Sequence, residues 1–141
     1  FLPVGIVNAP DVIAANNTMI SINGALTVDA YGQVVADTID GRQFSGIGGA
    51  EDFVAGAGLE LSDRSLICLP STVEKNGVLR SRIVGRFDAG AVITTPRHQV
   101  DIVITEYGAA ELEGRTVGER AEALAAIARP QFRDEILATV R

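Results

Sequence analysis

Residues that build metal centres, disulfide frameworks and catalytic triads are scarce in this chain of 141 residues. It contains one cysteine, one histidine and no tryptophan. Cys68 lies in an apolar run, 66–69, which excludes a disulfide framework and is typical of a buried thiol in a reducing compartment. His98 follows Pro96-Arg97 in a polar turn, so a histidine-based triad or a metal cluster lacks its parts. We therefore expect no metal site.

Positive charge and long apolar runs are scarce as well. The 12 lysines and arginines are outnumbered by 18 acidic residues, the net charge is −6, and aromatic residues make up 5%. This composition argues against a nucleic-acid groove and against binding to an anionic membrane surface. No apolar run approaches the ~18 residues of a membrane helix, and no basic segment precedes a signal core. We expect a soluble, cytoplasmic protein with no nucleic-acid or membrane partner.

Hydrophobic residues are plentiful, at 47% of the chain, which is enough for one core. We therefore predict one domain over residues 1–141. The chain begins at Phe1 without a methionine and is apolar from its first residue, unlike the frayed polar ends of many domains. We interpret it as a fragment of a longer protein. Its missing part would meet a surface that includes Leu2, Val4 and Ile6, and we expect a homo-oligomer.

A glycine-rich segment, residues 44–53, is the feature around which we organise the chain. Gly46, Gly48 and Gly49 fall within four residues, so the backbone can turn sharply and present bare N–H groups. Residues 50–57 are compatible with a short helix that has Glu51 and Asp52 in its first turn, where we expect Asp52 to bond loop amides. A glycine loop that opens a helix suits an anion or an oxyanion. A plain tight turn is the alternative.

Strand patterns dominate the first hundred residues. They predict strands over 19–23, 25–29, 34–37, 64–69 and 100–105, and a short strand over 1–7. We expect a hairpin across 30–33, with a bulge or close approach near Gly24, and a second hairpin that pairs 80–87 with 91–94. A helix of one or two turns is expected over 11–15, and a polar link over 71–78.

The last quarter of the chain is helical in pattern. Thr116 and Glu119 fit a capping box, and apolar residues at helical spacing follow them. Pro130 ends that helix and begins a final one over 131–141. Strands early in the chain and helices late in it favour an α/β fold, a mixed and largely parallel sheet flanked by helices.

Few side chains are candidates for chemistry on residue type and position alone. Glu106 follows a central strand, where open α/β sheets bind ligands, although a loop carboxylate that caps backbone amides is an equally simple reading. Ser71 lacks the flanking glycines of a nucleophile elbow and reads as a loop serine. Five basic residues suit either phosphates or a solvated face: Lys75, Arg80, Arg82, Arg86 and Arg97.

Nearly the whole chain resembles the C-terminal domain of the acetyl-CoA hydrolase/transferase family, which includes 4-hydroxybutyrate, butyryl and succinyl CoA-transferases. The resemblance rests on many short segments in one order rather than on any single motif. They are residues 19–26 with Asp29 and 32–33, 45–49 with 52–53, 69–72, 81–84, 94–97, 100–101, 105–108, 112–114, 119–121 and 127–133.

The resemblance implies an enzyme built from two related α/β halves of the CoA-transferase type, like NagB and RpiA, with this chain in the second half. In that family a glutamate attacks an acyl-CoA thioester, becomes a glutamyl-CoA thioester and passes CoA to an incoming carboxylate. The glutamate of the family belongs to a segment upstream of the matched region, so we expect this fragment to be inactive alone. The implied partners are acyl-CoA, a small carboxylate and the N-terminal half of the same protein.

The resemblance also implies roles for residues of this chain. The Gly49 backbone N–H would donate to the oxyanion of the tetrahedral intermediate. Coenzyme A would contact four residues of the glycine loop and two others: Ser45, Gly46, Gly48, Gly49, Asn23 and Lys75. Glu106 and Asn23 match positions near the carboxylate and CoA sites. Lys75 is displaced by one position, with Glu74 in the place of the family's lysine. An acyl-CoA hydrolase and a non-catalytic CoA- or nucleotide-binding module are the alternatives.

Overall fold

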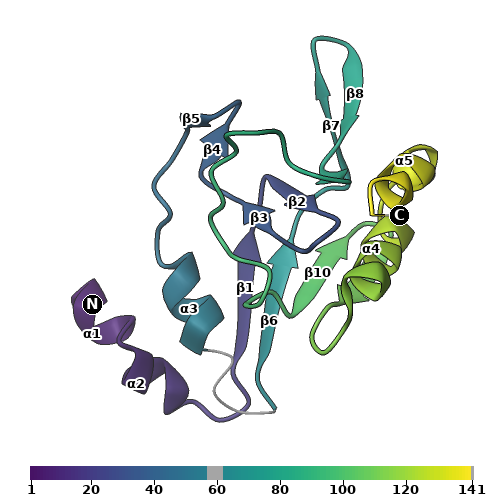
Figure 1. Ribbon diagram of the computed structural model, residues 1–141. Helices are drawn as coiled ribbons and strands as arrows, with labels where there is room; N and C mark the ends of the chain where they lie inside the picture. The colour runs from purple at the N-terminus through teal and green to yellow at the C-terminus, as the bar shows by residue number, and fades with distance from the viewer. Residues whose placement is uncertain (57–61, 141) are drawn as a thin grey trace.

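The computed structural model describes residues 1–56 and 62–140. Its largest sheet has the strand order β1-β6-β10-β11, and Figure 1 shows β1 at one edge with β6 and β10 beside it. These strands are β1 (Ile20–Gly24), β6 (Arg64–Cys68), β10 (Ile102–Thr105) and β11 (Gly108–Glu111). The first three run parallel, and β11 is antiparallel to β10. The predicted mixed, largely parallel sheet is therefore confirmed, including the central position of the strand that ends at Thr105.

One face of this sheet belongs to the hydrophobic core. Ile67 on β6 and Val103 on β10 are exposed by 3% and 0%, and they cluster with Val54 and Leu124 from two helices. The strands of a parallel sheet usually form continuous apolar runs, because helices and connections pack on the sheet. Strands of antiparallel sheets more often alternate apolar and polar residues. The apolar runs within 66–69 and 102–104 meet this requirement.

In Figure 1, α3 lies at the left of the sheet next to β1, and α4 lies at the right beyond β10. They are α1 (Val4–Val7), α2 (Pro10–Ala14), α3 (Ala50–Gly56), α4 (Val117–Ala126) and α5 (Arg133–Ala138), with a 3-10 turn, η1 (Pro130–Phe132), before α5. The helices predicted to begin near residues 11, 50 and 116 are confirmed as α2, α3 and α4. Two of the predicted helices, 50–57 and 131–141, end at Ala57 and Arg141, which lie outside the described residues. Among the described residues, no helix has the length and apolar character needed to cross a membrane.

The predicted capping box is present at the start of α4. The Thr116 amide donates to Glu119 Oε2 at 2.8 Å, and the Glu119 amide donates to Thr116 Oγ1 at 3.4 Å. We expect Thr116→Ala to lower the free energy of unfolding by about 1 kcal/mol, because one amide of the first turn loses its acceptor. Thr116→Ser keeps the oxygen and should unfold close to the wild-type midpoint in urea. Equal midpoints for the alanine and serine variants would contradict this.

Three small sheets surround the large one. One has the strand order β3-β2-β9, and its strands are β2 (Thr27–Asp29), β3 (Val34–Val35) and β9 (Ile83–Val84). The second pairs β4 (Thr38–Ile39) with β5 (Arg42–Gln43). The third pairs β7 (Thr72–Lys75) with β8 (Val78–Ser81). The hairpin across 30–33 is confirmed. Its turn is held by Asp29, which is fully buried and accepts from the amides of Tyr31 and Gln33 at 3.1 and 2.9 Å.

Several sequence predictions are wrong. Residues 4–7 form a helix after Pro3 rather than a strand. No bulge joins 19–23 to 25–29, because β1 and β2 belong to different sheets. The segment 71–78, predicted as a polar link, contains β7 and the turn of the β7–β8 hairpin. Residues 80–81 pair with residues 72–73, whereas the prediction paired them with residues 91–94. The overlooked signal is Asn76-Gly77, whose φ values of 55° and 75° provide the left-handed turn that two-residue hairpins need.

Candidate functional site

The glycine loop lies exposed between β5 and α3. Gly48 has a φ of 64°, a conformation that favours glycine. The Ser45 amide is already used by the fold, since it donates to the Asp37 carbonyl at 3.2 Å. The Gly49 carbonyl accepts from the Phe53 amide at 3.3 Å and so begins α3. Among the hydrogen bonds of the described residues, none has the Gly49 N–H as its donor. That amide is therefore unpaired within the described part of the chain.

A hollow of about 420 Å³ brings Gly49 close to the edge strand. It is lined by Met19, Ile20, Ser21, Ile22, Asn23, Gly49, Ala50 and Phe53. Asn23 Nδ2 is buried and has no hydrogen-bond partner among the described residues. A buried donor without an acceptor costs free energy, so a ligand that supplies an acceptor at this place would be favoured. The structure thus brings together two predicted site residues, Asn23 and Gly49.

Asn8 also contributes to this place, and the sequence analysis did not predict that contact. Its Nδ2 donates to Asp52 Oδ2 at 3.0 Å, which ties the loop before α2 to the first turn of α3. A Cβ atom at residue 49 would overlap that same Asn8 Nδ2. Glycine is therefore needed at 49 for close approach to Asn8 as well as for an open amide. The partner of Asp52 is a side chain rather than the loop amides that we expected.

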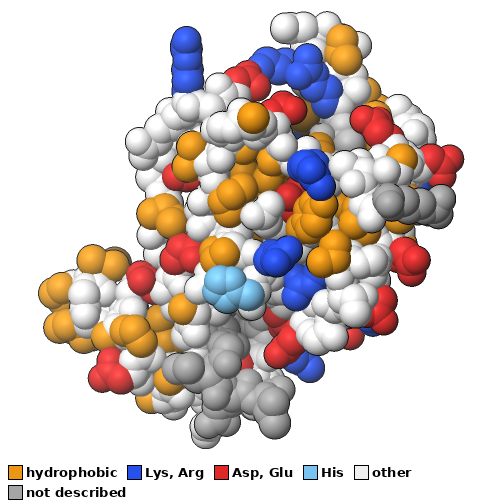
Figure 2. All heavy atoms as spheres, in the orientation of Figure 1, with side chains coloured by type: hydrophobic (Ala, Val, Ile, Leu, Met, Phe, Trp, Pro, Cys, Tyr) orange, Lys and Arg blue, Asp and Glu red, His pale blue; other side chains and the backbone are white. Residues whose placement is uncertain are grey.

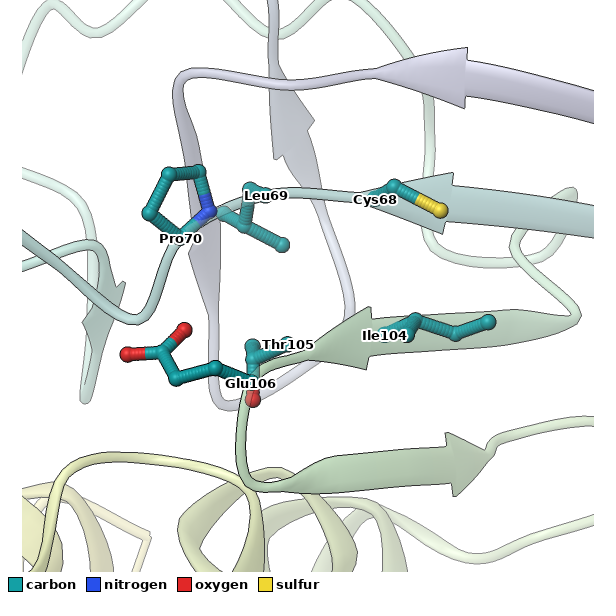
Figure 3. A pocket seen from close by; sticks show the side chains of 6 residues that line it. All are labelled: Cys68, Leu69, Pro70, Ile104, Thr105 and Glu106. Atoms are coloured by element: carbon teal, nitrogen blue, oxygen red, sulfur yellow. The ribbon is translucent and has the colours of Figure 1, made fainter.

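Glu106 lies at the carboxyl end of β10 and bridges to the segment that follows β6. The Ser71 amide donates to Glu106 Oε2 at 2.8 Å, and the Ser71 hydroxyl donates to Oε1 at 2.5 Å. These bonds, the hydroxyl first, hold the pKa of the Glu106 carboxyl below its ordinary value. In Figure 3 the carboxylate points toward the Pro70 segment, away from Cys68. Glu106 therefore acts as the backbone-capping carboxylate that we gave as the alternative.

A second hollow, of about 540 Å³, lies beside Glu106 (Figure 3). It is lined by Cys68, Leu69, Pro70, Ile104, Thr105 and Glu106. This hollow lies at the carboxyl ends of β6 and β10, the edge where parallel α/β sheets bind ligands. The Gly49 hollow runs along β1 and reaches that edge at Asn23. The structure does not bring Glu106 into the Gly49 hollow.

The match to known proteins covers the chain. A family model, the acetyl-CoA hydrolase/transferase C-terminal domain, matches residues 1–140. This chain belongs to that family. It is 46% identical over 134 residues to the 4-hydroxybutyrate coenzyme A transferase of Clostridium kluyveri and 40% identical over 136 residues to the butyryl-CoA:acetate CoA-transferase of Anaerostipes caccae. The matches cover 95% and 96% of this chain, and 31% and 30% of the two relatives.

The fold agrees with this membership of the acetyl-CoA hydrolase/transferase family. The crystal structure of RipA from Yersinia pestis matches with a TM-score of 0.85 and 41% identity, over 97% of this chain and 30% of RipA. The chain thus spans about a third of the length of its relatives. The predicted family resemblance and fold are confirmed.

The other cofactor positions predicted for this acetyl-CoA hydrolase/transferase domain do not converge on either hollow. Ser45, Gly46 and Gly48 lie on the exposed loop next to Gly49. Lys75, near the end of the β7–β8 hairpin, forms an ion pair with Asp40 at 2.8 Å and lowers the pKa of that carboxyl through a hydrogen bond. Arg86 donates to the Tyr31 hydroxyl at 2.5 Å. In Figure 2 the lysines and arginines are spread over the face shown rather than gathered.

The acidic residues and the cysteine are spread as well. Within residues 1–56 and 62–140, no group of three or more histidine, cysteine, aspartate and glutamate side chains is placed to hold a metal ion.

The Ser71–Glu106 pair predicts a pH dependence of stability. A carboxyl whose pKa is lowered by folding stabilises the native state above its ordinary pKa, and this contribution is lost as the pH falls through the lowered value. We expect Ser71→Ala to lower the free energy of unfolding at pH 7 by about 1 kcal/mol, because solvent screening at the exposed carboxylate weakens the hydroxyl bond. The difference from wild type should shrink below pH 4. Thermal unfolding at both pH values, with the exposed-site variant Ser62→Ala as control, measures it.

Proposed function

We propose that this chain is the C-terminal part of a CoA-transferase that moves CoA between a short acyl-CoA and a small carboxylate. The names of the relatives support this substrate class, and their length supports a longer parent protein. One observation carries the assignment of the site. Two donors that have no acceptor among the described residues, the Gly49 amide and Asn23 Nδ2, belong to residues that line the same hollow.

The proposed reaction begins with a glutamate from the preceding part of the parent protein. Its carboxylate attacks the thioester carbonyl carbon, and the carbonyl oxygen becomes an oxyanion. Collapse of this intermediate expels the CoA thiolate and leaves an acyl-glutamyl anhydride. The thiolate then attacks the glutamyl carbonyl, which releases the carboxylate of the first substrate and forms the glutamyl-CoA thioester. The incoming carboxylate then attacks the glutamyl-CoA thioester, and the same steps in reverse release its acyl-CoA and the free glutamate. A carboxylate nucleophile divides one difficult transfer into easier ones.

In this proposal Gly49 stabilises the charge that develops on the carbonyl oxygen. A preorganised amide donor of this kind contributes about 3 kcal/mol to the transition state. Asn23 would supply a second donor to the same oxygen or to the carboxylate. The apolar side chains of Met19 and Phe53 around the hollow suit a short aliphatic acyl group.

Other residues have supporting roles in the proposal. Ser45, Gly46 and Gly48 would contact the thiol end of coenzyme A, and Lys75 would contact the CoA tail after release from Asp40. Glu106 would hold the carboxyl ends of β6 and β10 in place through Ser71 rather than react. We also propose that the parent protein is a homo-oligomer. Apolar side chains that gather on α1 and its flanks, at the left of Figure 2, stay predicted contacts of the missing part: Phe1, Leu2, Val4, Ile6 and Val7.

An assay of the full-length protein tests the reaction class. We expect CoA transfer from acetyl-CoA to depend on a second carboxylate, with little free CoA released without it. Release of free CoA at an equal rate without an acceptor would show a hydrolase, which the family also includes. Binding of CoA without any turnover would show a non-catalytic module. The isolated chain should have no activity, because the proposed nucleophile is not part of it.

A further inference from the structure

One face of the four-stranded sheet is apolar and open in the part of the chain that the structure describes. In the strand registers, Ile22 pairs with Leu66 and Leu66 pairs with Ile102, so these side chains point to one face. Ile20 and Ile22 on β1 are exposed by 56% and 68%. The remaining apolar members of this open face are partly exposed: Leu66, Cys68, Ile102 and Ile104. Within β1, β6, β10 and β11, its charged members are Arg64 and Glu111, which pair with Ile20 and Ile102.

The connections between the parallel strands explain why this face is bare. The chain moves from β1 to β6 and then to β10 in one direction along the sheet, and right-handed crossovers in one direction pack on one face. Val28 on β2, Val54 on α3 and Ile83 on β9 belong to these connections, and all three lie in the core with Ile67 and Val103. Ile67 and Val103 point away from the open face. The described residues of the two connections that belong to the core therefore pack on the face opposite the open one.

Parallel sheets are stable in α/β proteins when both faces are covered. In doubly wound sheets the second face is covered by crossovers on the other side of the first strand, where the direction of winding reverses. Here that side begins at β1, the edge strand nearest in sequence to the start of the chain. About two thirds of each relative's length lies outside the part that this chain matches.

We infer that the open face is the docking surface for residues of the parent protein that precede Phe1, and that they place at least one helix on it. This inference rests on the proposed membership of a longer protein, and it names the surface at which the two parts meet. The contact is apolar and belongs to one folded unit, so it resembles a core cut in two more than an interface between separate proteins.

Thiol labelling of the full-length protein tests this without any assay of activity. In the variant Ile22→Cys, without substrate, N-ethylmaleimide should modify residue 22 about 100-fold more slowly than residue 122 in the control Glu122→Cys, which lies on the exposed side of α4. Unfolding in urea should make the two rates equal. In the unaltered protein, Cys68 should likewise stay unmodified until unfolding, which keeps the test decisive if Ile22→Cys fails to fold.

Three results would overturn the inference. One is an equal native rate at residues 22 and 122, and another is rapid native labelling of Cys68. The third is protection that disappears on dilution, which would show that a second copy of the protein covers the face. Because the readout is a rate of modification, protection of Cys68 in the unaltered protein without CoA transfer would refute the proposed function alone. Transfer by that protein without protection of Cys68 would refute this inference alone.

Discussion

Replacing Gly49 by proline in the full-length protein should lower kcat by about 100- to 1000-fold. Proline removes the N–H that we propose as the oxyanion donor, and the amide has no other role among the described residues. Any Cβ at this position also overlaps Asn8 Nδ2. The proline variant and its control therefore both carry Asn8→Ala, which removes that overlap. Asn8→Ala/Gly49→Ala is the matched control, because it adds a Cβ and keeps the N–H.

We expect that alanine control to lie within about 10-fold of the single variant Asn8→Ala. KM for acyl-CoA should change little in the proline variant, because the interaction forms fully only in the transition state. Thermal unfolding of both double variants identifies any loss of the fold. Equal kcat values for the two double variants, with both folded, would contradict the role of the Gly49 amide.

Replacing Asn23 by aspartate should lower kcat by about 100-fold or more. The buried Nδ2 donor becomes a carboxylate oxygen, which repels the negative charge that forms in the hollow. Asn23→Ala removes the donor without adding charge, and its kcat should fall by about 10-fold. Steady-state rates for the three proteins give the comparison.

Asn17→Asp makes the same chemical change at an exposed position outside the hollow, so its kcat should match wild type. If Asn23→Asp and Asn17→Asp had equal effects, net charge rather than the hollow would be responsible. If Asn23→Ala lost more activity than Asn23→Asp, packing rather than charge would explain the effect of residue 23.

Local patterns predicted the parts of the fold that local physics determines. The apolar runs of β6 and β10 and the capping box at Thr116 follow from short-range rules, and the structure has them. The β7–β8 hairpin was missed because polar residues at 71–77 hid the Asn-Gly turn, although that turn was readable. Residues 1–7 are apolar without a clear period, so strand and helix could not be told apart.

Long-range contacts determined what the sequence could not show. Asn8 lies beside Gly49, and Ser71 donates a hydrogen bond to Glu106, which is 35 positions away in the sequence. No sequence pattern predicts either contact. The open face appeared only with the strand registers, since Ile20 and Ile22 read as ordinary strand residues. The glycine loop was a candidate anion site because three glycines before a helix suit an oxyanion. The particular roles of Gly49 and Asn23 came from the family resemblance and stay predictions.

A crystal structure of the full-length protein with an acyl-CoA bound tests the central claim most directly. Our account predicts the thioester carbonyl oxygen in the hollow beside β1, about 2.7 to 3.1 Å from the Gly49 amide nitrogen. A carbonyl oxygen outside that hollow, bonded to other donors while the Gly49 N–H faces solvent, would contradict it.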